Sequence, residues 1–344
     1  MVKALMISSL DEIRAMLAAL PGPDEAAAAA ARQREANLTK PAGSLGRLES
    51  LAEWLSAWQG RHPPVMDKPH AAVFVANHGI ANLGVSAYGM EVTEQMYHNY
   101  LHGGAGFNTM CRAMGVAYDI YPIEIDRPTE DFTQAPAMTE ADLVAAFNVG
   151  LAAIRPEMSV FCPGEMGIAN TASAAAVLAA LFKGTAKEWT GAGSGVTGVF
   201  LQNKIDVVRE GLALHTADDP DPLEILRRLG GRELAAMSGA ILAARMLRVP
   251  VLVDGFLCSA SAAVLEMTQP GALAHCQFSH ASLEAGHALL MKKLSGDPIL
   301  HMDMRLGEAT GAILAVGILR SAVACHTELL TFEEARVSRN KPMV

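Results

Sequence analysis

The sequence predicts an α/β protein: a Rossmann-like parallel sheet domain flanked by helices, with a small helical domain formed from both termini. From residue 70 onward, short apolar runs rich in β-branched residues alternate with helical patterns. Strands that are buried on both faces and separated by helices indicate a parallel sheet. Helical patterns precede and follow this region. We therefore expect a large domain at 62–308 and a small helical domain that combines 1–61 with 309–344.

The N-terminal elements are predicted as three helices. An amphipathic pattern opens the chain at 1–17, and an alanine-rich stretch of good helix formers follows at 24–38. A Pro-Ala-Gly turn then leads into a helix whose apolar face holds Leu48, Leu51, Leu55 and Trp58. A proline-punctuated link at 61–69 separates these helices from the first strand.

Four segments of the larger region predict strands, and two of them continue through a turn into a helix of small residues. In parallel sheets, ligands bind beyond the carboxyl ends of the strands, where these polar and glycine-bearing turns fall. The segments are AAVFVANHG (71–79), VAYDIYPIEI (116–125), MSVFCPGEMGIANTASAAAVLAALF (158–182) and VPVLVDGFLCSASAAVLEM (249–267).

Composition excludes several classes of protein. With 344 residues, 51% of them hydrophobic, the chain can bury a large core, and its net charge of −9 argues against a nucleic-acid partner. No apolar run reaches the ~18 residues of a membrane span, and no signal peptide is visible. The five cysteines are widely spaced, with no CxxC pair. We therefore expect a soluble cytoplasmic protein with reduced thiols.

The stretch FCPGEMGIANTA (161–172) is the first candidate site. Gly164 and Gly167 bracket Glu165 and Met166 at a strand end, while Asn170 and Thr171 begin the following helix. The backbone amides of such a turn suit a phosphate. The alternative is that the glycines serve turn geometry alone.

A second glycine-rich loop, TGAGSGV (190–196), contains Gly193 and precedes Lys204. A lysine close to such a loop is a candidate partner for a phosphate or carboxylate, and a solvated surface lysine is the alternative. The spacing is not that of a P-loop. The strand before Asp254 carries one acid rather than the pair of pyrophosphate-dependent phosphoribosyltransferases, which excludes that class.

The stretch HCQFSHASLEAGH (275–287) offers metal-ligand residue types, including an i, i+3 step from Glu284 to His287. No second such pair and no HExxH motif accompany it. We therefore interpret His280 and Ser282 as polar groups of a pocket, and we expect no metal and no cofactor.

Glu308 opens an apolar helix in MRLGEATGAILAVGIL (304–319), with glycine before it and glycine three residues after it. One interpretation is helix capping, in which the carboxylate faces the positive end of the helix dipole. The other is a general base whose pKa is tuned by partial burial. A nearby helix N-terminus lowers that pKa and desolvation raises it, so the sequence does not fix the direction.

Several stretches, taken together and in order, resemble one family over roughly residues 30–335. The family is that of nicotinate-nucleotide–dimethylbenzimidazole phosphoribosyltransferases, which make the lower-ligand nucleotide of cobalamin. The stretches are LTKPAGSLGRLE, ANHGI with GVSAYGMEVTEQM, GEMGIANT, GGRELAAMSGAILAA, SHASLEAGH and MRLGEATGA.

The resemblance implies a homodimer in which nicotinate mononucleotide and a benzimidazole-type base react without a cofactor. A ring nitrogen of the base attacks the anomeric carbon, nicotinate leaves, and Glu308 takes the proton from the other ring nitrogen. The resemblance also gives Glu165 and Lys204 catalytic roles, and it places Ser282 and the turn around Gly164 and Gly167 at the phosphate. The base-binding slot is implied at Leu306, Ser86, Tyr88 and Gln95.

Two departures lie in one turn, where the family usually reads GIGNTT and this chain reads GIANTA. Ala169 replaces a glycine, and its methyl group disfavours a positive φ or a close backbone approach. Ala172 replaces a threonine and lacks its hydroxyl. Because Glu308, Glu165 and Lys204 remain, we expect an active enzyme.

Other functions stay open at this point. Within the family, the accepted base could be dimethylbenzimidazole, another benzimidazole, a purine or a phenolic compound. The departures raise the alternative of a paralogue that binds a nucleotide or a base without turnover. The sheet alone suggests a NAD-dependent dehydrogenase, but no GxGxxG follows the first strand.

Overall fold

The structure is a computed structural model that describes residues 5–338. Within that range, five parallel strands form one sheet in the order β2-β1-β3-β4-β5. This arrangement confirms the predicted α/β class with a parallel sheet. The strands are β1 (Pro69–Val75), β2 (Ala117–Pro122), β3 (Val160–Met166), β4 (Val251–Val253) and β5 (Cys276–Phe278).

Helices cover both faces of this sheet, because alternate side chains of the strands point to opposite sides. Ala72 and Phe74 of β1 join one apolar core, whereas Ala71 and Val73 join the other. The first core is completed by α6 (Glu140–Ala153), α7 (Asn170–Leu181), α10 (Pro222–Leu229), α11 (Arg232–Met246) and α12 (Phe256–Thr268). The second core is completed by α3 (Arg47–Gln59), α4 (Glu91–Leu101), α5 (Gly106–Met114) and α14 (Thr310–Glu328).

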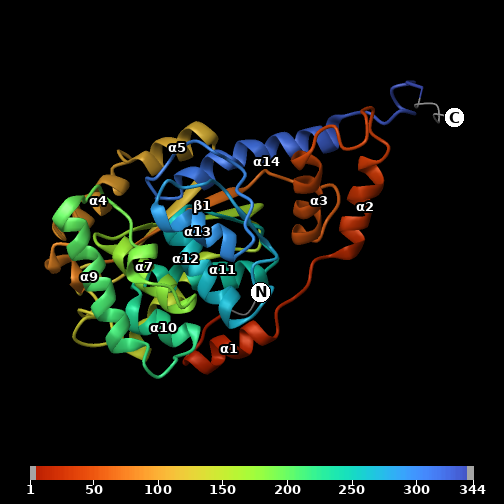
Figure 1. The fold of residues 1–344 in the computed structure, drawn as a ribbon. Helices are drawn as coiled ribbons and strands as arrows, with labels where there is room; N and C mark the ends of the chain where they lie inside the picture. The colour runs from red at the N-terminus through yellow and green to blue at the C-terminus, as the bar shows by residue number, and fades with distance from the viewer. Residues whose placement is uncertain (1–4, 339–344) are drawn as a thin grey trace.

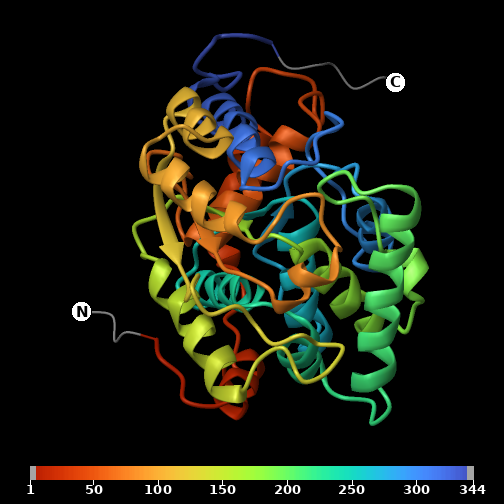
Figure 2. The same ribbon diagram turned by 90° about the vertical axis from the view of Figure 1, so that its left-hand side faces the viewer.

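Four further helices also contribute buried residues to the first core. Figure 2 shows the long helix α9 at the edge of the molecule. These elements are the 3-10 helix η1 (Gly79–Leu83), α8 (Ala186–Trp189), α9 (Gly198–His215) and α13 (Ala285–Lys293).

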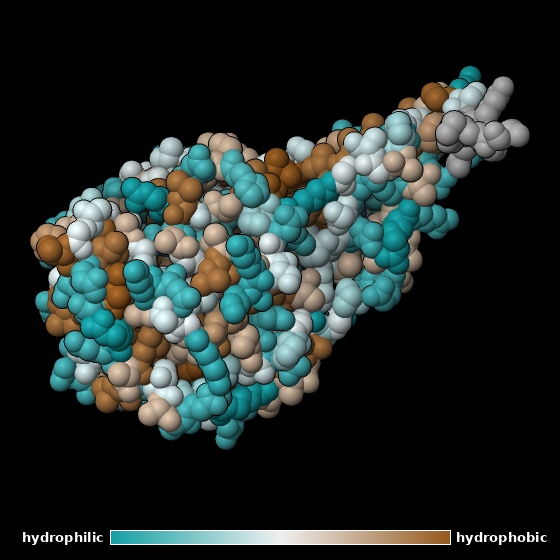
Figure 3. All heavy atoms as spheres, viewed as in Figure 1, coloured by the Kyte–Doolittle hydropathy of each residue, from teal (hydrophilic) through white to brown (hydrophobic). Residues whose placement is uncertain are grey.

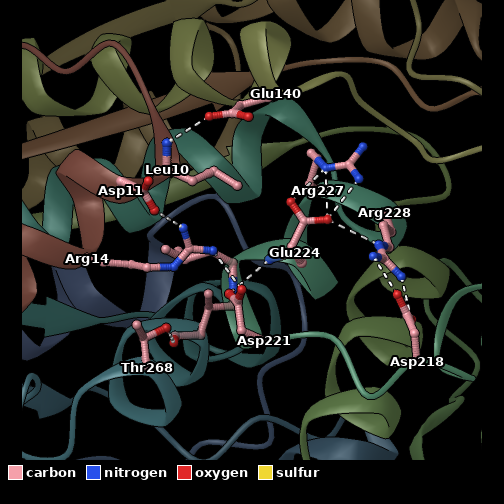
Figure 4. Close-up of polar contacts among 12 residues, drawn as sticks. Leu10, Asp11, Arg14, Glu140, Asp218, Asp221, Glu224, Arg227, Arg228 and Thr268 are labelled. Atoms are coloured by element: carbon pink, nitrogen blue, oxygen red, sulfur yellow. Dashed lines mark hydrogen bonds and ion pairs between the residues drawn. The ribbon is translucent and has the colours of Figure 1, made fainter.

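The N-terminal helix α1 (Leu10–Ala18) packs against the main body rather than against α2 (Glu25–Glu35) and α3. Its apolar residues belong to the first core. Figure 4 shows its polar anchors: the Leu10 amide donates to Glu140 at 3.0 Å, and Arg14 pairs with Asp221 at 2.6 Å. Within the predicted helical domain of 1–61 and 309–344, the segment containing α1 therefore lies apart from the other helices.

Helices α2 and α3 lie beside the C-terminal part of α14, and together they project from the main body (Figure 1). Arg34 of α2 holds the end of α14 by donating to the carbonyls of His326, Thr327 and Leu329 at 2.6–3.1 Å. The division of the chain at 61/62 and 308/309 stays a prediction, with this projecting helical unit as its physical counterpart.

Among residues 5–338, one helix, α14, is long and apolar enough by length and composition to cross a membrane, although the sequence shows no uninterrupted apolar run of that length. Half of the apolar stretch of this helix is buried inside the protein, and the helix packs against α3, α5 and β3. Hydrophilic and hydrophobic residues are interspersed over the face in Figure 3, including the projecting unit. These contacts make α14 a core helix of the fold.

Candidate active site

A cavity of about 320 Å³ lies at the carboxyl ends of β3 and β4, where the parallel sheet predicts a ligand site. The turns after both strands and the segment that leads into α14 meet there. Its walls are formed by 165–168, Asn170, Thr171, 193–194, 254–258 and 305–308, together with Tyr88, Ser282 and Glu284.

Two helix N-termini face this cavity without a side-chain cap. Asn170 begins α7 after the N-cap residue Ala169, and Phe256 begins α12 after the N-cap residue Gly255. Uncapped first-turn amides and the helix dipoles favour an anion. Ser282 and Arg305 also line the cavity. This wall has the chemistry of a phosphate site.

Ala169 adopts the left-handed conformation, with φ of 77°. This is the conformation that the sequence marks as unfavourable for a methyl-bearing residue. Ala169 is buried, and neither Ala169 nor Ala172 is among the residues that line the cavity. The two departures therefore strain or repack the turn without removing a group from the cavity wall.

Lys204 lies behind the cavity wall rather than in it. The side chain is 1% exposed, and Nζ donates to Thr171 Oγ1 at 2.7 Å and to the Gly191 carbonyl at 3.1 Å. Burial lowers the pKa of Lys204 to about 8, against a smaller opposing effect of Glu284. The surface-lysine interpretation is therefore wrong, and the ammonium acts on the cavity through Thr171.

The glycine-rich loop at 190–196 is held next to Lys204 by hydrogen bonds to the backbone of Gly193. The Gly193 amide donates to the Glu284 carboxylate at 3.2 Å, and its carbonyl accepts from Arg305 at 3.1 Å. Gly193 has φ of 53°, and a Cβ there would lie 2.7 Å from Lys204 Nζ. Glycine is therefore required for both the backbone conformation and the close approach.

Glu165 is a buried carboxyl that accepts a short hydrogen bond from the side-chain amide Nδ2 of Asn170. Burial raises its pKa to about 8, with Glu233, Glu308 and Asp254 adding in the same direction. Asn170 opposes this shift. Glu165 therefore carries its proton near neutral pH.

Glu308 is not the cap of α14. It lies two residues before the helix, with φ of 58°, and the helix amide of Ala312 is instead capped by Asp254 Oδ1 at 2.9 Å. Glu308 lines the cavity and is 6% exposed. Burial raises its pKa, while Tyr100 and the Phe107 amide lower it and Asp254 raises it further.

Close packing explains why glycine stands at positions 307 and 311, on either side of Glu308. A Cβ at Gly307 would lie 2.4 Å from Glu165 Oε1, and a Cβ at Gly311 would lie 1.9 Å from His280 Nδ1. The first glycine lets the two carboxyl-bearing segments approach each other. The second makes room for His280, which faces Asp254 at 3.4 Å.

The structure brings most of the predicted site residues together, but not all. Gly164 lies under the Glu308–Ala309 backbone, where a Cβ would be 2.5 Å from the Ala309 amide, so it serves packing. His280 is buried behind Asp254 and does not line the cavity. Ser86 bonds to Ser194 at 3.1 Å, and Gln95 is exposed and lies outside the cavity wall. The residues that do line it are Glu308, Glu165, Gly167, Asn170, Thr171, Gly193, Ser282, Leu306 and Tyr88.

Sequence reasoning missed four groups at this site: Asp254, Glu284, Arg305 and Tyr100. Asp254 follows a buried strand, which was a usable signal. Glu284 was noted only as a possible metal ligand, whereas Arg305 and Tyr100 are brought to the site by tertiary packing, and no local pattern marks them. Among residues 5–338, no cluster of three or more His, Cys, Asp or Glu side chains is arranged to hold a metal ion.

Comparisons with known proteins identify the family. A family model described as phosphoribosyltransferase matches residues 20–337. A protein of Cereibacter sphaeroides named nicotinate-nucleotide–dimethylbenzimidazole phosphoribosyltransferase is 53% identical over 331 residues, covering 96% of this chain and 98% of the relative. A protein of the same name from Ruegeria pomeroyi is 52% identical over 332 residues, with the same two coverages.

The chain belongs to the nicotinate-nucleotide–dimethylbenzimidazole phosphoribosyltransferase family. The crystal structure of CobT from Thermus thermophilus has the same fold, with a TM-score of 0.85 and 36% identity over 92% of this chain and 100% of that one. The family resemblance inferred from the sequence motifs is thereby confirmed.

Proposed function

We propose that the protein transfers the 5-phosphoribosyl group of nicotinate mononucleotide to a benzimidazole, with 5,6-dimethylbenzimidazole as the expected acceptor. The products are α-ribazole phosphate and nicotinate. The observation that carries the proposal is one cavity lined both by a buried acid pair, Glu308 and Glu165, and by two uncapped helix N-termini. Relatives that are 52–53% identical bear the name of this reaction.

The phosphate of the mononucleotide is assigned to the N-termini of α7 and α12. Thr171 and Ser282 supply hydroxyl groups there, and Arg305 supplies positive charge. Lys204 donates to Thr171 and adds a buried charge behind it. Because the neutral form of Glu165 carries no negative charge near neutral pH, it does not repel the phosphate.

The reaction step is a nucleophilic displacement at the anomeric carbon. A ring nitrogen of the benzimidazole forms the new C–N bond, and the bond to the pyridinium nitrogen breaks, so nicotinate leaves as a neutral ring. The configuration inverts to α. Glu308 accepts the proton from the second ring nitrogen as positive charge develops on the azole, which general-base catalysis accelerates by about 10² to 10⁴-fold.

Leu306 and Tyr88 are assigned to the acceptor base. Both line the cavity, and they are 59% and 56% exposed. We propose that Ser86 and Gln95 act near the same slot, Ser86 by holding Ser194 of the glycine-rich loop. An apolar slot distinguishes one methyl group by only ~1–3 kcal/mol, so other benzimidazoles, purines and phenolic compounds are expected to compete.

We further propose that the protein works as a homodimer in the cytoplasm. Exposed apolar side chains at and near the cavity mouth, including Leu306, Leu283 and Met302, give a second copy a surface to cover. All five cysteines are free, as expected in a reducing compartment.

The test is incubation of the purified protein with nicotinate mononucleotide and 5,6-dimethylbenzimidazole, followed by chromatography and mass analysis. Formation of α-ribazole phosphate with an equal amount of nicotinate supports the proposal. Binding of either substrate without product would instead support the alternative of a non-catalytic paralogue. A panel of other bases in the same assay then ranks acceptors.

A further inference from the structure

Tyr100 lies buried behind Glu308, with a hydroxyl group that nothing else in the described structure uses. The side chain is 1% exposed, and within residues 5–338 its Oη has no partner in hydrogen-bond geometry. The same is true of Glu308 Oε2. Two buried polar atoms without partners are costly unless they serve each other or a ligand.

The position of Tyr100 is fixed by its surroundings. Its ring packs edge-to-face on Phe107, with centroids 6.0 Å apart. Asn108 donates to the Tyr100 carbonyl at 3.0 Å and accepts from the Ala105 amide at 3.2 Å, which locks the corner between α4 and α5. The phenol therefore has little freedom to turn away from Glu308.

The N-terminus of α5 brings a second donor to the same carboxylate. A Cβ at Gly106 would lie 3.9 Å from Glu308 Oε2, so this oxygen faces the start of α5, which packs beside α14 (Figure 1). The Phe107 amide and the Tyr100 hydroxyl both lower the pKa of this carboxyl and so favour its ionised form. Because Glu308 also lines the cavity, Oε1 is the oxygen left for a ligand.

We propose that Tyr100 is a positioning residue for the general base: with the Phe107 amide it holds Glu308 Oε2, so that Oε1 faces the ring N–H of the acceptor. This inference rests on the proposed function. When the ring proton moves to Oε1, the carboxylate becomes a neutral carboxyl, and the hydrogen bonds at Oε2 weaken. The Tyr100 hydroxyl and the Phe107 amide therefore set how readily Glu308 is ionised before the reaction.

Three titratable groups surround Glu308 in the described structure: Tyr100 from α4, Glu165 from β3 and Asp254 from the turn after β4. Burial and Asp254 raise the pKa of Glu308, whereas Tyr100 and the Phe107 amide lower it. Removing only the Tyr100 hydroxyl must therefore raise the pKa of Glu308, with the ring packing intact.

The test is Tyr100→Phe, assayed with nicotinate mononucleotide and 5,6-dimethylbenzimidazole from pH 5 to 9. We expect about a tenfold lower kcat at pH 6, as for loss of a hydrogen bond to a charged group. We also expect the acidic limb of the kcat profile to move to higher pH, and an unchanged KM for the mononucleotide. Tyr121→Phe is the control, since its hydroxyl bonds to Asp119 at 3.4 Å, outside the cavity wall.

A double-mutant cycle completes the test. In a Glu308→Gln background, Tyr100→Phe should cause no further loss of kcat, because its effect acts through the carboxylate. An active wild type with an unshifted profile in Tyr100→Phe, or equal losses in both backgrounds, would overturn the inference and leave the proposed function standing. A wild type that forms no product would overturn both.

Discussion

The left-handed conformation of Ala169 makes a quantitative prediction about stability. An L-residue with a Cβ costs about 1–2 kcal/mol in this region, and glycine avoids that cost. The greater conformational entropy of glycine stabilises the unfolded chain by about 0.4–1 kcal/mol, which offsets part of this stabilisation of the folded state. With φ of 77° at this residue, Ala169→Gly should raise the free energy of unfolding by about 0.5–1 kcal/mol.

Ala172 provides the matched control, three residues further along in the first turn of α7. It is fully buried and helical, so Ala172→Gly should lower the free energy of unfolding by about 1 kcal/mol. The assay is urea denaturation of wild type and both variants under identical conditions. Opposite signs confirm the reasoning, whereas a loss of stability in Ala169→Gly as large as that in Ala172→Gly would refute it. Since neither alanine lines the cavity, the KM for nicotinate mononucleotide should stay within twofold of wild type in Ala169→Gly.

Three further changes test the site. Gly193→Ala should raise the KM for nicotinate mononucleotide at least tenfold in steady-state assays. The reason is that the new Cβ would lie 2.5 Å from Thr171 Oγ1 and 2.7 Å from Lys204 Nζ. An unchanged KM would contradict the close packing of Gly193 against these two side chains. Lys204→Met should weaken mononucleotide binding, measured by calorimetry, more at pH 7 than at pH 9. The reason is that burial lowers the pKa of Lys204 to about 8, so the wild-type ammonium is lost above that pH. Equal weakening at both pH values would show that the positive charge of Lys204 does not contribute to binding. For Glu165, the folded-state pKa of about 8 lies above the unfolded value, so its contribution to stability falls as pH rises. Between pH 5 and 7 that loss amounts to about 2 kcal/mol in urea denaturation, and Glu165→Gln should remove it; a variant that keeps the wild-type pH dependence would exclude this carboxyl as its source.

The sequence was sufficient for four of the five described strands and for the turn after β3, because these follow from local patterns, whereas the three-residue strand β5 was not predicted. The strand 160–166 and the helix that begins at Asn170 are each marked by apolar periodicity and by a glycine-bearing turn. The same patterns place Glu165 at the carboxyl edge of a parallel sheet, where the structure has it, whereas the place of Glu308 in the same site was implied only by the family resemblance.

What the sequence could not give depends on contacts between distant segments. The sequence left open whether Glu308 caps α14 or faces the cavity. In the structure, Asp254 accepts the hydrogen bond from the Ala312 amide and so caps the helix, although it lies 58 residues away in sequence. The glycines at 307 and 311 appear in the sequence as flexible positions, whereas their reasons are the side chains of Glu165 and His280. The direction of the Glu308 pKa shift likewise needed the burial of the folded chain.

We propose above that Glu308 is the base of a phosphoribosyl transfer in this cavity. The most direct test compares wild type with Glu308→Gln in the presence of nicotinate mononucleotide and 5,6-dimethylbenzimidazole, with mononucleotide binding measured on the same samples. We expect α-ribazole phosphate from wild type, and at least about a hundredfold lower kcat with unchanged mononucleotide affinity in the variant. Equal rates from the two proteins would contradict it.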